Sequence, residues 1–335
     1  GARAVPQNDK TAYCDAGSRE GFLEVIAAIG DCRYPDELVQ DRRDVENQVF
    51  LTLNTAELRF LPRDVRNVVA GLYLQMGQML HLPDGSDLQA LVLLDIYLGR
   101  STTEIFDDDD TLPAMCMSMM KLLSKVDAGT RHQTDCHVFL SAATRFSQWL
   151  YQAGHSRREQ RGLAPREFTD DDLRRQEQVF LQAVQWRIDQ PTAHFWLGVF
   201  CERLNAATDG LFKAALDWIL EQGASEARVA LQNFHVFELP QRRLALGLLC
   251  HGLVAARVLD FETLRPSTND AWEPVFARDI EVSKSNRSRL AHMEWIQQSM
   301  FEVLQIATDS DRDSLERAID FASAVLRESA HEPQQ

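Results

Sequence analysis

The chain has 335 residues, and its content of hydrophobic (45%) and charged (25%) residues is that of a globular protein, which excludes disorder of the whole chain. One hydrophobic core rarely serves more than about 250 to 300 residues, so we expect two domains or two repeats of one fold. The formal net charge of −15 repels a phosphate backbone and argues against direct binding to nucleic acid.

The sequence shows no feature of a membrane or secreted protein. No apolar run approaches the roughly 20 residues that cross a bilayer, and residues 1–10 lack the apolar core of a signal peptide. The six cysteines are scattered singly, without a CxxC pair, as is typical of free thiols in a reducing compartment. We therefore expect no membrane partner and an intracellular location, nuclear or cytoplasmic.

Apolar residues recur with a helical period along the whole chain, and no segment shows the alternation of a β-strand. The sequence therefore predicts an all-α fold. Residues 1–18 are polar, and a short helix is then expected around Val25 and Ile29. A second helix is expected to end near Leu53.

Five helical segments are expected between residues 64 and 190. The first carries an apolar stripe that we expect to face the core, formed by Leu72, Met76, Met79 and Leu80. The third, residues 112–125, is apolar nearly all round, which predicts a place in the centre of a helix bundle. The fourth and fifth begin after the N-cap signals Thr134-Asp135 and Thr169-Asp170.

Pro191 precedes a second series of helices, which are expected to begin near residues 192, 211, 227, 241 and 287. The helix from residue 241 contains Gly247 and Gly252, and small residues of this kind allow two helices to approach closely. A last helix is expected over Ser314–Leu326.

No motif for nucleotide binding, nucleophilic catalysis or a zinc protease occurs in the chain. His132, Cys136 and His137 are close in sequence, but a fourth ligand for tetrahedral zinc is not evident. The acidic run Asp107–Asp110 lacks the alternating ligands and the glycine turn of a calcium loop. We therefore expect no catalytic residue, no cofactor and no metal site.

Four charged residues mark this helical series in a definite order: Arg66, Asp95, Lys125 and Glu177. Lys125 follows Ser124 and is one of only five lysines in the chain, so composition does not account for its position. In this order and within these apolar helices, the four residues resemble the cyclin box of the cyclin family. The resemblance covers residues 64–308, by motif in the first half and by helical pattern in the second.

The resemblance implies an architecture of two tandem five-helix cyclin-box repeats with helical extensions at both ends. The first box is expected over residues 64–190, with an insertion at 154–166, and the second cyclin-like repeat over 191–308. An N-terminal helical extension, residues 1–63, and a C-terminal helix and tail, residues 309–335, complete the expected organisation.

The resemblance also implies roles for the charged residues. In cyclins, the residues that match Arg66 and Asp95 form a buried salt bridge between the first two helices. Those that match Lys125 and Glu177 reach the activating helix of a cyclin-dependent protein kinase, and Asp127 lies in the same kinase-contact segment. The chain is thus expected to be a non-catalytic regulatory subunit of such a kinase. A cyclin-fold scaffold or adaptor without a kinase stays an alternative, as does an unrelated helical enzyme, for which no site is visible.

The segment that corresponds to the substrate-docking patch of cyclins is degenerate here. It consists of Val65, Val69, Leu72 and Gln75. Leu72 stands where the family has a tryptophan, and Gln75 where it has a glutamate. We therefore expect weak docking of arginine-x-leucine substrate motifs.

The insertion at residues 154–166 is the one basic segment of an acidic chain. It carries four arginines against a single glutamate: Arg157, Arg158, Arg161 and Arg166. Two interpretations stay open, a solvated loop and a docking site for an acidic or phosphorylated protein segment, because arginine forks bind carboxylate and phosphate bidentately.

Overall fold

The computed structural model describes residues 16–51, 60–100, 111–127, 135–256, 258–259, 295–296 and 299–330. All regular elements in these ranges are helices, which confirms the all-α fold class. None of the described helices combines the length and apolar character needed to cross a membrane. Thr134, the acidic run Asp107–Asp110 and the beginning of the helix expected from residue 287 lie outside the described residues.

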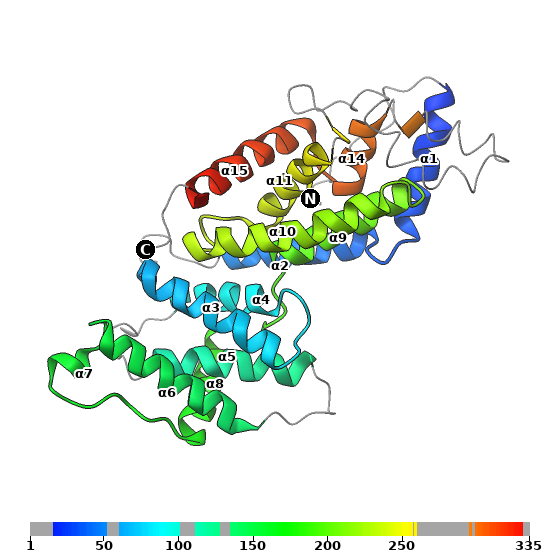
Figure 1. Ribbon diagram of the computed structural model, residues 1–335. Coiled ribbons are helices and arrows are strands. Elements are labelled where there is room, and N and C mark those ends of the chain that lie inside the picture. The colour runs from blue at the N-terminus through cyan, green and yellow to red at the C-terminus, as the bar shows by residue number, and fades with distance from the viewer. Residues whose placement is uncertain are drawn as a thin grey trace, which may run out of the picture. The chain divides into compact units, whose positions relative to one another are not determined.

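Figure 1 shows the helices in chain order: α1 (Ala16–Gly30), α2 (Asp36–Leu51), α3 (Arg63–Met79), α4 (Ser86–Arg100), α5 (Leu112–Asp127), α6 (Cys136–Gln152), α7 (Arg157–Gln160), α8 (Asp170–Ala183), α9 (Ala193–Ala207), α10 (Lys213–Asn233), α11 (Gln241–Ala255), α14 (Met300–Thr308) and α15 (Arg312–Ala330). The prediction of a separate helix from residue 227 is wrong, because α10 runs through this position without a break. Gly223, inside α10, costs only about 1 kcal/mol relative to alanine, which the surrounding alanines, leucines and glutamates offset.

The described structure divides into two compact units. One unit consists of the described residues within 1–40, 197–222 and 246–322, and the other of those within 41–196, 223–245 and 323–335. Several helices, such as α9 and α10, contribute residues to both units. This division does not test the expected borders of tandem repeats, which stay a prediction.

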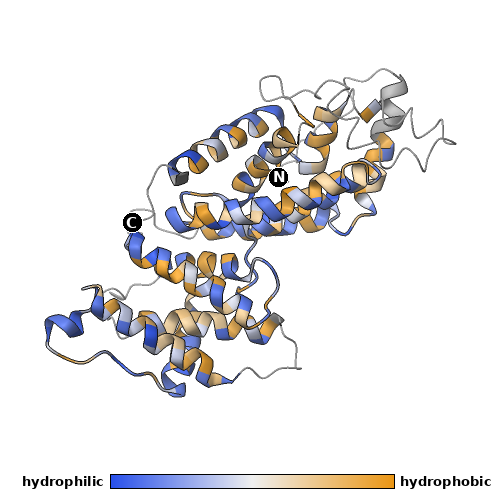
Figure 2. Ribbon diagram, viewed as in Figure 1, coloured by the Kyte–Doolittle hydropathy of each residue, from blue (hydrophilic) through white to orange (hydrophobic). Residues whose placement is uncertain are grey.

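The second unit is built around α5. This helix packs against α3, α4, α6 and α8, the last two lying beside it in Figure 1. Met115, Met117, Met119 and Met120 are fully buried, as the all-round apolar pattern of α5 predicts. α4 is also buried on every side, from Ser86 to Leu98. Figure 2 shows the contrast with α15, along which hydrophilic and hydrophobic residues alternate.

The apolar stripe expected on α3 is partly wrong. The buried face is set by Val65, Val69, Tyr73 and Met76. Met79 is 49% exposed, because α3 ends at this residue and its side chain extends past the last packed turn. The core face therefore begins at Val65, about two turns before the start of the expected stripe at Leu72.

The starts of α6 and α8 are fixed by side-chain caps, as the sequence predicts. The Asp135 carboxylate accepts a hydrogen bond from the His137 amide at 3.0 Å. At α8, the Thr169 hydroxyl accepts from the Asp172 amide while the Asp172 carboxylate accepts from the Thr169 amide, a reciprocal capping box. Both helices therefore begin at defined residues.

The first unit contains a fully buried arginine, Arg203 on α9. Its Nε donates to the Ala307 carbonyl at 2.6 Å, at the end of α14, and its NH1 group donates to the Tyr34 carbonyl at 2.9 Å. Its NH2 group pairs with Asp36 at 2.7 Å, at the start of α2. Because arginine has five N–H donors in a planar fork, one side chain joins three chain segments.

Gly247 on α11 marks a close approach to α15 within the same unit. A Cβ atom at this position would lie 2.2 Å from the Ala318 carbonyl oxygen and 2.5 Å from the Ala322 Cβ. Gly198 on α9 is a matched helical glycine with nothing within 4 Å of such a Cβ. The expectation that small residues in α11 permit close helix contacts is confirmed at Gly247.

We predict opposite effects of alanine at these two glycines. Gly247→Ala should lower the free energy of unfolding by about 1 to 3 kcal/mol, because the backbone of α15 must move. Gly198→Ala should leave it unchanged or raise it by about 0.5 to 1 kcal/mol, through helix propensity. Urea titrations of the two variants and the parent measure both; equal midpoints for the variants would contradict the close approach.

Candidate interaction site

Arg66 on α3 and Asp95 on α4 form a doubly hydrogen-bonded ion pair, as expected. The guanidinium donates to the two carboxylate oxygens at 2.5 and 2.8 Å, and each side chain is only 1% exposed. A buried charge pair is tolerated only when its remaining polar atoms are also bonded. The surroundings of this pair meet that condition.

The additional partners come from the end of α10 and the segment after it. Arg66 Nε donates to the Leu231 carbonyl at 2.7 Å, and the Val236 amide donates to Asp95 Oδ2 at 2.8 Å. His235 Nδ1 lies 3.5 Å from Asp95 Oδ1. The pair therefore joins three segments of its unit, one more than the two helices that the resemblance implies.

The pKa of the Asp95 carboxyl reflects a competition. Burial would raise it, but the Arg66 charge and hydrogen bonds with His235 and Arg66 prevail, so the pKa lies below its ordinary value. The carboxylate form is thus the one that the folded chain favours.

Lys125 and Glu177 are brought together on the surface of this unit. Lys125, in the last turn of α5, donates from Nζ to Oε1 of Glu177 on α8. The lysine side chain is 51% exposed and the glutamate 15%. A pair with a largely exposed lysine contributes only about 0 to 1 kcal/mol to folding.

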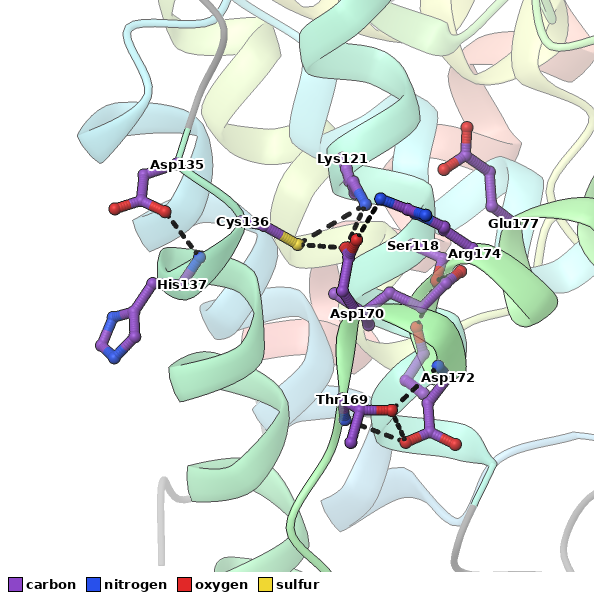
Figure 3. A network of polar contacts seen from close by, with 12 residues as sticks. Ser118, Lys121, Asp135, Cys136, His137, Thr169, Asp170, Asp172, Arg174 and Glu177 are labelled. Atoms are coloured by element: carbon purple, nitrogen blue, oxygen red, sulfur yellow. Dashed lines mark hydrogen bonds and ion pairs between the residues drawn. The ribbon is translucent and has the colours of Figure 1, made fainter.

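A second lysine–carboxylate pair lies on the same seam between α5 and α8. Lys121, one turn before Lys125, pairs with Asp170 at 3.1 Å, and Asp170 also pairs with Arg174 at 2.6 Å. Cys136, the first residue of α6, places its Sγ 2.6 Å from Asp170 Oδ1 and 3.5 Å from Lys121 Nζ (Figure 3).

Sequence reasoning missed this cluster of Lys121, Cys136 and Asp170. Asp170 was expected only as a helix-cap residue, and Cys136 was considered only as a metal ligand. The available signal was the spacing of Lys121 and Lys125, two of the chain's few lysines, at positions four apart on one helix.

Residues next to Lys125 extend the exposed end of α5. Val126 is 55% exposed, an unusual fraction for a valine at the end of a buried helix. Asp127 is the last residue of α5, and its side chain lies outside the described part of the chain.

The predicted docking patch is split between core and surface. Val65 and Val69 are buried, whereas Leu72 is half-buried and Gln75 is exposed. The first two residues therefore belong to the packed face of α3 and do not offer an exposed apolar surface to a peptide.

Two arginines of the basic insertion contact other residues of the chain. Arg158 Nε donates to the Ala164 carbonyl at 2.7 Å. Arg166 pairs with Asp172 at 2.6 Å, and its guanidinium lies 5.3 Å from the Phe168 ring centre. Arg157 and Arg158 are the first two residues of the short helix α7, and Arg161 follows this helix as an exposed residue. The segment is thus partly ordered by contacts within the chain, and both interpretations, a solvated loop and a docking site, stay open.

Within the described ranges, no group of three or more histidine, cysteine, aspartate or glutamate side chains has the arrangement of a metal site. A scan against protein-family models matched no family, and a search of curated proteins matched no relative.

We predict that Asp95→Ala strongly destabilises the fold, because it leaves the Arg66 guanidinium buried without its counter-charge. The expected loss is about 3 to 5 kcal/mol of unfolding free energy. The matched control is Asp217→Ala, which removes a carboxylate from the exposed pair with Lys213 and should change stability by less than about 0.5 kcal/mol. Denaturant titration of the two variants measures both values; similar effects would exclude the anchoring role of Asp95.

The Asp95 carboxylate also predicts an acid-dependent loss of stability. Because its pKa is lower in the folded chain than the ordinary 3.8, the folded state binds fewer protons than the unfolded state in this range. Its stabilising contribution is present above the ordinary pKa and is lost as the pH falls through the folded value. The difference in unfolding free energy between the parent and Asp95→Asn should therefore shrink below about pH 4. A pH-independent difference would contradict this assignment.

Proposed function

We propose that this chain is a cyclin-like regulatory subunit that binds and activates a cyclin-dependent protein kinase. The observation that carries the proposal is the surface pair of Lys125 and Glu177. The two residues are separated by 52 positions in sequence, yet they meet on adjacent helices of one bundle. Both match kinase-contact positions in the resemblance to cyclins.

The arrangement of the bundle supports the same proposal. Five long helices lie between residues 63 and 183, namely α3, α4, α5, α6 and α8. The third of them packs against all four others. Because the resemblance implies a five-helix box, this number of long helices supports the proposal.

Activation would rest on positioning rather than on chemistry by this chain. A lysine ammonium has three donors, and a glutamate carboxylate has two acceptor oxygens, so the bonded pair keeps further capacity for a partner's polar groups. Since the two side chains already hold each other in place on rigid helices, binding would cost less conformational entropy than it would for two separate flexible side chains.

The alternative is a cyclin-fold scaffold or adaptor without a kinase. Such a protein would need the buried pair of Arg66 and Asp95 for its fold, but it would have no use for an exposed pair at kinase-contact positions. The presence of both pairs in one chain favours the kinase-binding subunit.

We predict that the double variant Lys125→Ala/Glu177→Ala folds normally and loses kinase activation. Truncating a charge pair that becomes closed off from water at an interface costs about 2 to 5 kcal/mol of binding free energy. The measurement is the affinity and activity of purified cyclin-dependent kinases, tested as a panel with the full chain.

The matched control is Lys213→Ala/Asp217→Ala, which removes another exposed lysine–carboxylate pair, on α10. It should leave binding and activation unchanged. If the parent chain binds a kinase and the Lys125/Glu177 variant binds and activates it equally well, the assigned contact is wrong. If the parent binds none of the panel, the scaffold alternative is favoured.

A further inference from the structure

Cys136 is distinguished from the other described cysteines by its neighbours. Its sulfur lies 3.5 Å from the Lys121 amine and 2.6 Å from the Asp170 carboxylate. Cys116, Cys201 and Cys250 are buried, and burial raises the pKa of each of these thiols to about 12. Cys136 is only half-buried, so a small oxidant can reach it.

The Lys121 side chain is held close to this sulfur. The Lys121 side chain is only 13% exposed, and Asp170 bonds both its amine and the Cys136 thiol. Figure 3 shows the three groups converging from α5, α6 and the start of α8. A lysine amino group, an oxidisable thiol and a carboxylate thus lie in contact with one another.

We propose that Lys121 and Cys136 form a site of oxidative modification, at which a peroxide produces a covalent sulfur–nitrogen cross-link between α5 and α6. The site is independent of the proposed kinase function and needs no partner protein for its detection.

The reaction has two balanced steps. In the first, the Cys136 thiol is oxidised by hydrogen peroxide to a sulfenic acid, with release of one water. In the second, the neutral Lys121 amine attacks the sulfenic sulfur, a sulfur–nitrogen bond forms, the sulfur–oxygen bond breaks and a second water leaves. Asp170 accepts the proton that the amine loses, and the water that departs carries it away. Sulfenic acids are known to condense with nitrogen nucleophiles to sulfenamides, and a thiol reverses such products.

Protonation controls the rate of this reaction. Burial and the hydrogen bond with Asp170 raise the pKa of the Cys136 thiol, against the opposing effect of the Lys121 charge. Burial would lower the pKa of the Lys121 amine, but hydrogen bonding to Asp170 prevails and raises this pKa. Both the thiolate and the free amine therefore become more abundant as the pH rises, and the rate of cross-linking should rise with them.

The test is treatment of the purified full chain with hydrogen peroxide, followed by intact-mass and tryptic peptide analysis. The expected product has lost two hydrogen atoms, contains peptides with Lys121 and Cys136 joined, and is not cleaved by trypsin after Lys121. Dithiothreitol should restore the original mass and the cleavage. The yield at a fixed time should increase with pH.

Three variants make the result specific. Lys121→Arg retains a positive charge but has no nucleophilic amine, so it should give Cys136 sulfinic acid and no cross-link. Asp170→Asn removes the carboxylate that raises the pKa of both groups, so its cross-linking should set in at lower pH than that of the parent. Cys32→Ser removes the other half-buried described thiol and should cross-link like the parent.

Several results would overturn the proposal. One is oxidation of Cys136 in the parent to sulfinic or sulfonic acid, with full tryptic cleavage after Lys121. Another is a cross-link that persists in Lys121→Arg, which would show that a different amine reacts. The first readout comes from the parent chain and the second from a variant that keeps the positive charge, so a folding defect should not affect either result. Circular dichroism of the variants verifies that they are folded.

Discussion

The ion pair of Arg66 and Asp95 is the constraint on which its unit depends. Two charges removed from water require a complete set of polar partners, and the Leu231 carbonyl and the Val236 amide complete that set. The pair thus fixes the end of α10 and the segment after it against α3 and α4. Apolar packing tolerates many arrangements of similar volume, whereas a buried bidentate pair tolerates one. This explains a charged pair in a core built mostly of leucine, valine and methionine.

α5 connects this anchored core to the surface of the same unit. Its first three turns are buried on nearly all sides, so its position is determined by α3, α4, α6 and α8. Its last turns emerge with Lys121 and then Lys125 on the side that meets α8. The packed core consequently fixes the backbone positions of both lysines. A flexible loop would not place two ammonium groups against specific carboxylates with this definition.

The sequence predicts those features that depend on local pattern. The all-round apolar character of α5 predicts its burial, and Thr169 followed by aspartates predicts the cap of α8, because both effects act within one or two turns. The buried face of α3 and the separate helix expected from residue 227 are predicted wrongly. Helix ends depend on packing as well as on propensity. The contacts of Arg66 with Leu231 and of Cys136 with Lys121 join residues distant in sequence, and no local pattern encodes them.

Depth of burial separates the roles of the charged pairs in this unit. Arg66 and Asp95 are inaccessible, so they cannot exchange partners without unfolding the segments that cover them, and their role is structural. Lys125 is half exposed, so its bond with Glu177 adds little to stability and can be replaced by a bond to another molecule. Lys121 is 13% exposed and Asp170 34%, so this pair, like Glu177 at 15%, is partly buried. Among these charged residues Lys125 is the one that another molecule reaches most readily.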